Sequence, residues 1–233
     1  MTVASRPKRQ LADDEGFGSS DETLTDRAYR AIEEQIVTLK LSPGAVISEA
    51  VLSKRLKIGR TPIREAIQRL ARERLMVIMP RRGIMVSEVN VHTQLRLLEV
   101  RREVERLVAR SAARRATPEE RERFAQMARD FEKSAKGNDE VRFMRVDREF
   151  NELSIVAARN EFAAGAMALV HSLSRRFWYI HYKQAADMPR AAKLHADVAR
   201  GIASQDEDAA AAASDRLLGY IERFTRDTVS ADH

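Results

Sequence analysis

The sequence contains no cysteine among its 233 residues, which excludes disulfide bonds and thiolate metal sites. No apolar run approaches the ~20 residues that a membrane-spanning helix needs, so we expect no membrane partner. The N-terminus lacks the apolar core of a secretory signal, and we therefore expect a cytoplasmic protein. Only 9 glycines occur, while alanine, arginine, glutamate and leucine are frequent, which favours a mainly α fold.

Positive charge is concentrated in one part of the chain. Residues 53–82 hold ten lysines and arginines against two glutamates, a net charge of +8, whereas the whole chain carries +6. The net charge of the rest of the chain is therefore close to zero. A concentrated cluster of cations is typical of phosphate binding, and the alternative is the solvated faces of ordinary helices.

The same stretch has the hydrophobic pattern of two short helices followed by two short strands. Apolar residues three and four apart predict the helices. They are Val51, Leu52, Leu56 and Ile58 in the first segment and Ile63, Ala66, Ile67 and Leu70 in the second. Thr61 and Pro62 suit the start of the second helix. Residues 77–79 and 84–86 read as strands joined by Pro80-Arg81-Arg82-Gly83. The pattern predicts a winged helix-turn-helix, which places one helix in the DNA major groove.

Three segments resemble the head of a GntR-family bacterial transcription regulator, namely Leu41-Ser42-Pro43-Gly44, the run 60–70 and the wing 80–83. The most specific of these is the Arg-Thr-Pro-x-Arg-Glu-Ala core within 60–70. The resemblance implies that Arg60 and Arg64 read guanines or phosphates, that Thr61 contacts phosphate and that Gly83 enters the minor groove.

The residues that we expect to contact DNA are Arg60, Thr61, Arg64, Arg81, Arg82 and Gly83. Two positions depart from the family pattern. Gly59 stands where a serine or threonine is usual, which removes a phosphate-binding hydroxyl. Ala50 stands where some members have a base-reading arginine, so the operator sequence is expected to differ from theirs.

The rest of the chain divides around this head. Residues 1–22 have the composition of a disordered arm, although their basic start could also touch DNA. We assign 23–87 to the winged helix-turn-helix domain, which opens with a helix over 24–39. Residues 91–229 are predicted to form an all-α bundle of six helices joined by short loops. The predicted helices cover about 91–116, 118–135, 139–158, 161–183, 189–204 and 206–228.

This second half resembles the FCD-type ligand-sensing domain of the FadR subgroup within the same family. The resemblance rests on Glu99-Val100-Arg101 with Glu105, on Asp147-x-x-x-Asn151 and on the run from His195 to Ile202. In most such domains an aspartate and three histidines hold a divalent metal beneath a pocket for a small carboxylate. The resemblance implies a metal of the zinc, nickel or manganese class at Asp147, Asn151 and His195.

The match to that metal site is incomplete. Asn151 replaces a histidine, and the last expected histidine falls near Leu217 or at Tyr220. Asp147 and Asn151, four residues apart, can share a helix face and act together with His195. Water or oxygens of the effector would then complete the site. Alternatively, Asp147 and Asn151 form buried hydrogen bonds and His195 pairs with Asp147, which preserves the pocket without a metal.

Several arginines could face this pocket and bind a carboxylate with two hydrogen bonds. The polar residues on the apolar helical segments are Arg101, Arg102, Arg175, Arg176, Tyr179 and His181. We choose Arg101, since it falls in the opening helix that resembles the family. We therefore expect the effector to be bound by Arg101, Asp147, Asn151 and His195, and interpret His92 and His171 as structural.

Together these features predict a ligand-responsive transcription regulator. We expect a repressor that binds a palindromic DNA operator as a homodimer and responds to a small organic acid. The aromatic helix over 161–183 and exposed apolar positions on the helix over 91–116 are candidate dimer surfaces. No nucleophile–base–orienter set or phosphate-binding glycine loop is present, so we do not expect an enzyme. The alternatives are an architectural DNA-binding protein without an effector and a metal-dependent enzyme.

Overall fold

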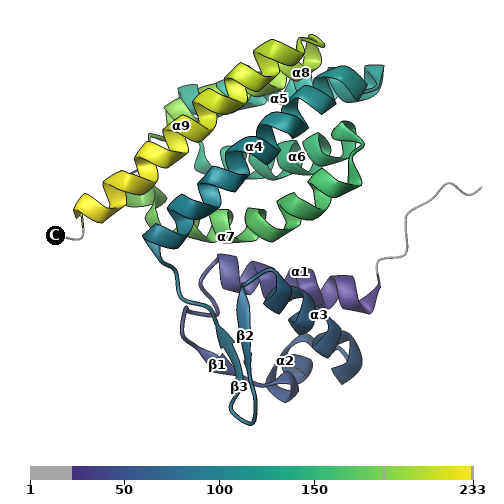
Figure 1. Ribbon diagram of the computed structural model, residues 1–233, viewed down its shortest axis with the longest axis vertical. Coiled ribbons are helices and arrows are strands. Elements are labelled where there is room, and N and C mark those ends of the chain that lie inside the picture. The colour runs from purple at the N-terminus through teal and green to yellow at the C-terminus, as the bar shows by residue number, and fades with distance from the viewer. Residues whose placement is uncertain (1–22, 186, 232–233) are drawn as a thin grey trace, which may run out of the picture.

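A computed structural model describes residues 23–185 and 187–231 of the chain, so the arm expected over 1–22 lies outside the described residues. Six elements form an N-terminal head (Figure 1). They are α1 (Leu24–Val37), β1 (Val46–Ile47), α2 (Glu49–Leu56), α3 (Arg60–Arg72), β2 (Met76–Met79) and β3 (Gly83–Val86). The strands make an antiparallel sheet in the order β1-β3-β2. The predicted helix-turn-helix and wing are present, whereas β1 was not predicted.

The head has a hydrophobic core of its own. Ile32 of α1, Leu52 of α2, Ile63 and Leu70 of α3 and Val86 of β3 are all fully buried within it. The apolar stripe of α3 thus packs inward as its spacing requires, and the opposite face of α3 remains exposed.

Six further helices form the C-terminal bundle, which is the all-α arrangement that the periodicity predicts. They are α4 (Val91–Arg115), α5 (Pro118–Gly137), α6 (Glu140–Ala158), α7 (Glu161–Ala185), α8 (Met188–Ala203) and α9 (Glu207–Ala231). Thr117 and Glu120 form a capping box at the start of α5, since each side chain bonds the other's backbone N–H. The bundle core includes Phe124, Phe131 and Leu218.

Two large apolar residues of α4 face outward. Val100 is 54% exposed and Leu107 is 47% exposed, although Leu98, Val108 and Ala112 on the same helix are buried. The 25-residue helix α4 carries more apolar residues than one buried stripe can hold, so part of them remains on the surface.

Helix α7 lies between the bundle and the head, directly over α1 (Figure 1). Leu173 of α7 packs against the hydrophobic core of the head. A single helix therefore contacts both parts of the chain. Within the described residues no helix is long and apolar enough to cross a membrane.

Candidate DNA-binding face and effector pocket

The exposed face of α3 carries the residues that we expect to read DNA. Gly59 is the N-cap residue of α3 and makes no side-chain capping hydrogen bond. Arg60 and Thr61 follow in the first turn, and both are exposed. Arg64 follows one turn later on the same exposed face. Backbone N–H groups at a helix N-terminus favour phosphate, so this end of α3 suits the DNA backbone.

Arg64 forms a bidentate ion pair with Glu49 at the start of α2. Its Nε donates to one carboxylate oxygen at 3.0 Å and a terminal nitrogen donates to the other at 2.9 Å. The hydrogen bond from Arg64 and its charge hold the pKa of Glu49 below its ordinary value. Because Arg64 is 61% exposed, the pair orients the guanidinium only weakly and leaves it accessible to DNA.

Arg69 is one of the ten cations of residues 53–82, but it is bound within the head. Its guanidinium stacks 3.8 Å from the ring centre of Tyr29 and pairs with Glu73 and Asp26. The α3 surface open to DNA is therefore narrower than the run of arginines suggests, and Arg69 joins α3 to α1.

The wing presents two arginines at its tip. Arg81 takes a left-handed conformation with φ of 63°, and the backbone N–H of Arg82 donates to Met79 at 3.1 Å. Both side chains are exposed. Gly83 follows with φ of 102°, and a Cβ there would lie 3.0 Å from the carbonyl oxygen of Ile47. The turn itself thus requires glycine, independently of any contact with DNA.

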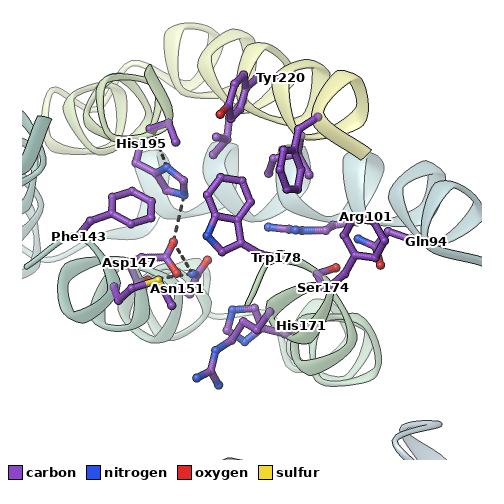
Figure 2. A pocket seen from close by; sticks show the side chains of 17 residues that line it. Gln94, Arg101, Phe143, Asp147, Asn151, His171, Ser174, Trp178, His195 and Tyr220 are labelled. Atoms are coloured by element: carbon purple, nitrogen blue, oxygen red, sulfur yellow. Dashed lines mark hydrogen bonds and ion pairs between the residues drawn. The ribbon is translucent and has the colours of Figure 1, made fainter. Parts of the chain in front are cut away.

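A pocket opens inside the bundle, enclosing about 620 Å³ of empty space with its mouth included. The four residues expected to bind an effector, Arg101, Asp147, Asn151 and His195, all line it (Figure 2). Helices α4, α6 and α8 supply these side chains. The family resemblance therefore pointed to residues that lie up to 94 positions apart in the sequence and line one pocket.

Asn151 and His195 both bond to Asp147 on one side of the pocket (Figure 2). The Asn151 amide nitrogen donates to Asp147 Oδ1 at 3.1 Å, and His195 Nε2 lies 3.0 Å from the same oxygen. His195 Nδ1 lies 2.8 Å from the carbonyl oxygen of Ala191.

Burial by itself raises the pKa of Asp147, but the hydrogen bond and charge of His195 outweigh it, so the pKa lies below its ordinary value. The carboxylate is therefore ionised, and its charge is compensated within the cluster.

These donors do not fit the metal centre that the family resemblance implies. Tyr220, at one position of the missing histidine, directs its hydroxyl to the backbone of Asp187, accepting from N–H at 2.9 Å and donating to oxygen at 3.1 Å. Leu217, the other position, is apolar. No three His, Cys, Asp or Glu side chains of the described ranges are grouped to hold a metal ion. The contacts are those of the metal-free alternative, and metal binding itself stays a prediction.

Arg101 enters the pocket from α4 (Figure 2). It is only 8% exposed, and its Nε donates to Glu105 one turn along the helix at 2.5 Å. Of the other polar candidates, Arg175 also lines the pocket, whereas Arg102, Arg176, Tyr179 and His181 do not. Arg102 instead bonds Asp215 and Glu222 of α9.

His171, which we interpreted as structural, lines the pocket together with Ser174 and Trp178. These three residues are three and four apart and so share one face of α7. Burial lowers the pKa of His171 to about 4, and the nearby charge of Arg101 adds to this, so the ring is neutral at pH 7. The 171/174/178 spacing was visible in the sequence, but the apolar residues around it gave no reason to prefer this face.

The same segment of α7 holds the head. Arg175 pairs with Glu33 of α1 at 2.9 Å, and the two side chains are only 20% and 10% exposed. Arg176 is 2% exposed and donates to the carbonyl oxygens of Ser87 and Glu88 at 2.8 and 3.2 Å, in the connection between head and bundle. Burial lowers the pKa of Arg176 to about 10. Adjacent residues of α7 thus contact the pocket and the head.

A basic winged helix-turn-helix joined to an all-α bundle with an internal pocket defines a class of protein, the transcription regulator with a sensor domain. Comparisons with known proteins specify the class further. The family "Bacterial regulatory proteins, gntR family" matches residues 24–86, and the FCD domain matches residues 96–220. The chain therefore belongs to the GntR family and carries its FCD domain.

Individual relatives agree with this assignment. The chain is 24% identical over 203 residues to the HTH-type transcriptional repressor RspR of Escherichia coli (strain K12), covering 87% of this chain and 89% of that protein. It is 27% identical over 190 residues to the Nta operon transcriptional regulator of Aminobacter aminovorans, covering 80% and 86%. Among solved structures, E. coli McbR/YncC shares the fold with a TM-score of 0.75 at 16% identity, covering 89% of this chain and 99% of that one.

Proposed function

We propose that this regulator binds a palindromic operator as a homodimer and represses transcription until a small organic acid occupies the pocket of the bundle. The observation that carries the proposal is that α7 lines the pocket with Ser174 and Trp178 and also holds the head through Arg175 and Arg176. Because the proposed function is to bind bacterial DNA, we expect the protein to act in the cytoplasm. A relative that is named a repressor supports the sign of regulation.

On the DNA side, α3 enters the major groove with Arg60 and Arg64, and Thr61 contacts a phosphate. Arg81 and Arg82 place positive charge at the wing tip, where the minor groove lies beside the recognition helix. Most of the affinity comes from phosphate contacts and depends steeply on salt, whereas the base contacts of α3 select the sequence.

Apolar side chains that the bundle leaves exposed support the proposed dimer. Val100 and Leu107 are seven residues apart on α4, so they share one face, and Phe162 at the start of α7 is 82% exposed. Large apolar side chains in such positions mark interaction surfaces. A two-fold axis through this region would present two heads to two half-sites.

The pocket communicates with the head because Arg175 belongs to both. It lines the pocket and at the same time pairs with Glu33 of α1. An organic acid bound beside Arg175 shifts this side chain away from Glu33, which loosens the contact between α7 and the head. A coupling of about 1–3 kcal/mol is typical of such regulators and changes operator occupancy roughly 5- to 150-fold.

The direct test is selection of operator sequences from random duplex DNA by the full chain, followed by binding titrations. We expect two-fold symmetric sites and a loss of about 1–3 kcal/mol for Arg60→Ala, which is about 5- to 150-fold in affinity. Arg145→Ala, an exposed arginine on α6, is the matched control and leaves affinity unchanged. Selection of sites without symmetry, or equal effects of the two substitutions, would contradict the proposal.

A further inference from the structure

The pocket is much more aromatic than the rest of the protein. Five of the thirteen Phe, Trp and Tyr residues in the chain line it. They are Phe143, Phe177, Trp178, Tyr220 and Phe224. Trp178 lies 4.7 Å from Phe224 between ring centres and extends into the middle of the space (Figure 2). Rings arranged in this way favour a flat, aromatic occupant, which gains stacking energy in addition to burial.

Three polar atoms on the α7 wall have no hydrogen-bond partner among the described residues. They are His171 Nε2, Ser174 Oγ and Trp178 Nε1, and each of these atoms is buried. An unpaired buried polar group costs about 1–3 kcal/mol, so such groups are rare unless something else satisfies them. The indole N–H can only donate and the serine hydroxyl can donate or accept. The α7 wall therefore favours a ligand with hydrogen-bonding oxygens or nitrogens around its edge.

Two arginines line the same space, and Arg175 is already paired with Glu33 of α1. Arg101 is buried beside the α7 wall, and Glu105 engages its Nε. On the other side Asp147 is already satisfied by Asn151 and His195. The pocket thus offers a guanidinium to an anion, while the position corresponding to the family's metal is filled by a hydrogen-bonded cluster of the protein.

We infer that the pocket takes an aromatic carboxylate with a second polar substituent, such as a hydroxyl, and binds it without a metal ion. The ring stacks against Trp178, the carboxylate accepts from Arg101, and the second substituent bonds Ser174 and His171. This inference rests on the proposed function, since it specifies the effector of that regulator. An aliphatic acid would leave the aromatic walls unmatched, and a metal chelate would need donors that Leu217 and Tyr220 do not provide.

The chain provides its own reporter for the test, because Trp178 is its only tryptophan. The full-length protein is titrated in EDTA with 4-hydroxybenzoate, with cyclohexanecarboxylate as the non-aromatic acid and with benzyl alcohol as the aromatic compound lacking a carboxylate. Trp178 fluorescence follows occupancy of the pocket. We expect 4-hydroxybenzoate to bind at least about tenfold more tightly than either control compound, a difference of about 1.4 kcal/mol.

Variants assign the contacts. Arg101→Met is expected to weaken 4-hydroxybenzoate about tenfold or more, since hydrogen bonds to charged groups contribute about 1.5–3 kcal/mol. Ser174→Ala removes one small hydroxyl and is expected to weaken 4-hydroxybenzoate binding about three- to tenfold. This variant tests the contacts of the pocket if the arginine variant does not fold. Arg145→Ala is the control and leaves the affinity unchanged.

Two results would overturn the inference. One is equal affinity for 4-hydroxybenzoate and cyclohexanecarboxylate, and the other is binding that appears only after zinc, nickel or manganese is added back. Operator affinity measured in the presence of each compound distinguishes failure of this inference from failure of the proposed function. If only the aliphatic acid weakens operator binding, the inference fails and the regulator stands. If 4-hydroxybenzoate binds tightly but operator affinity is unchanged, the ligand class stands and gating by this pocket fails.

Discussion

The ion pair between Arg175 and Glu33 provides a quantitative test of how the bundle holds the head. The nearest nitrogen and oxygen are 2.9 Å apart, and Arg175 also approaches Glu34 at 3.7 Å. Two unit charges about 4 Å apart at an effective dielectric constant of ~20 attract by about 4 kcal/mol. Desolvation of both side chains, which are only 20% and 10% exposed, offsets part of this. We therefore expect a net coupling energy of about 2 kcal/mol, above the 0.2–1 kcal/mol typical of exposed pairs.

A double-mutant cycle measures this coupling. The four proteins are the unmodified chain, Arg175→Met, Glu33→Gln and the double variant, and urea unfolding gives the free energy of each. The cycle removes the contribution of Glu34, since that contact is lost equally in both variants of Arg175. The matched control is the exposed pair Arg129 and Glu122, with side chains 52% and 76% exposed, for which we expect less than about 0.5 kcal/mol.

The same proteins also show whether the pair transmits a signal. If Arg175 couples the pocket to the head, its loss reduces the change in operator affinity that an effector produces, while operator affinity without effector changes less. A coupling energy no larger than that of the control pair would refute the reasoning. The contact would then be an ordinary surface ion pair, and the path from pocket to head would have to run through Leu173 or Arg176.

Three further outcomes are expected. Replacing both Val100 and Leu107 by glutamate is expected to give a monomer in light scattering with weaker operator binding, and a persistent dimer would place the interface elsewhere. Burial lowers the pKa of His171 to about 4, so the unfolded chain binds a proton that the folded chain rejects, and stability falls as pH drops below about 6.5. Unfolding free energies should decrease by about 2 kcal/mol from this group between pH 7.5 and 5, and His171→Gln should remove that part of the slope. Gly83→Ala is expected to cost about 1–3 kcal/mol in thermal or urea unfolding, because φ is 102° there, and a neutral effect would show that the wing relaxes.

Much of the fold could be predicted from local pattern. Each predicted helix is present with its ends within a few residues, because apolar spacing and capping residues act over one or two turns. The Thr117 capping box and the turn at Gly83 are examples, since the interacting groups are at most four positions apart. The strand β1 was missed, because two residues are too short for an alternating pattern.

The candidate site was predictable only where a sequence pattern carried it. Asp147 and Asn151 share a helix face by spacing, and the family resemblance added Arg101 and His195. The α7 wall was missed, since spacing alone could not show which face of α7 turns inward. Arg176 was considered for the pocket, but it is bound to Ser87, 89 positions earlier in the chain.

The sequence by itself determined the basic recognition helix, the wing and the helical bundle, because charge, capping and hydrophobic period are properties of neighbouring residues. Only the tertiary structure decided what α7 does. Glu33 and Arg175 are 142 positions apart, and their meeting depends on how the head docks against the bundle. The atoms of Ser174 and Trp178 that lack a hydrogen-bond partner among the described residues likewise arise from packing, because burial against neighbouring helices covers a polar group without supplying a partner.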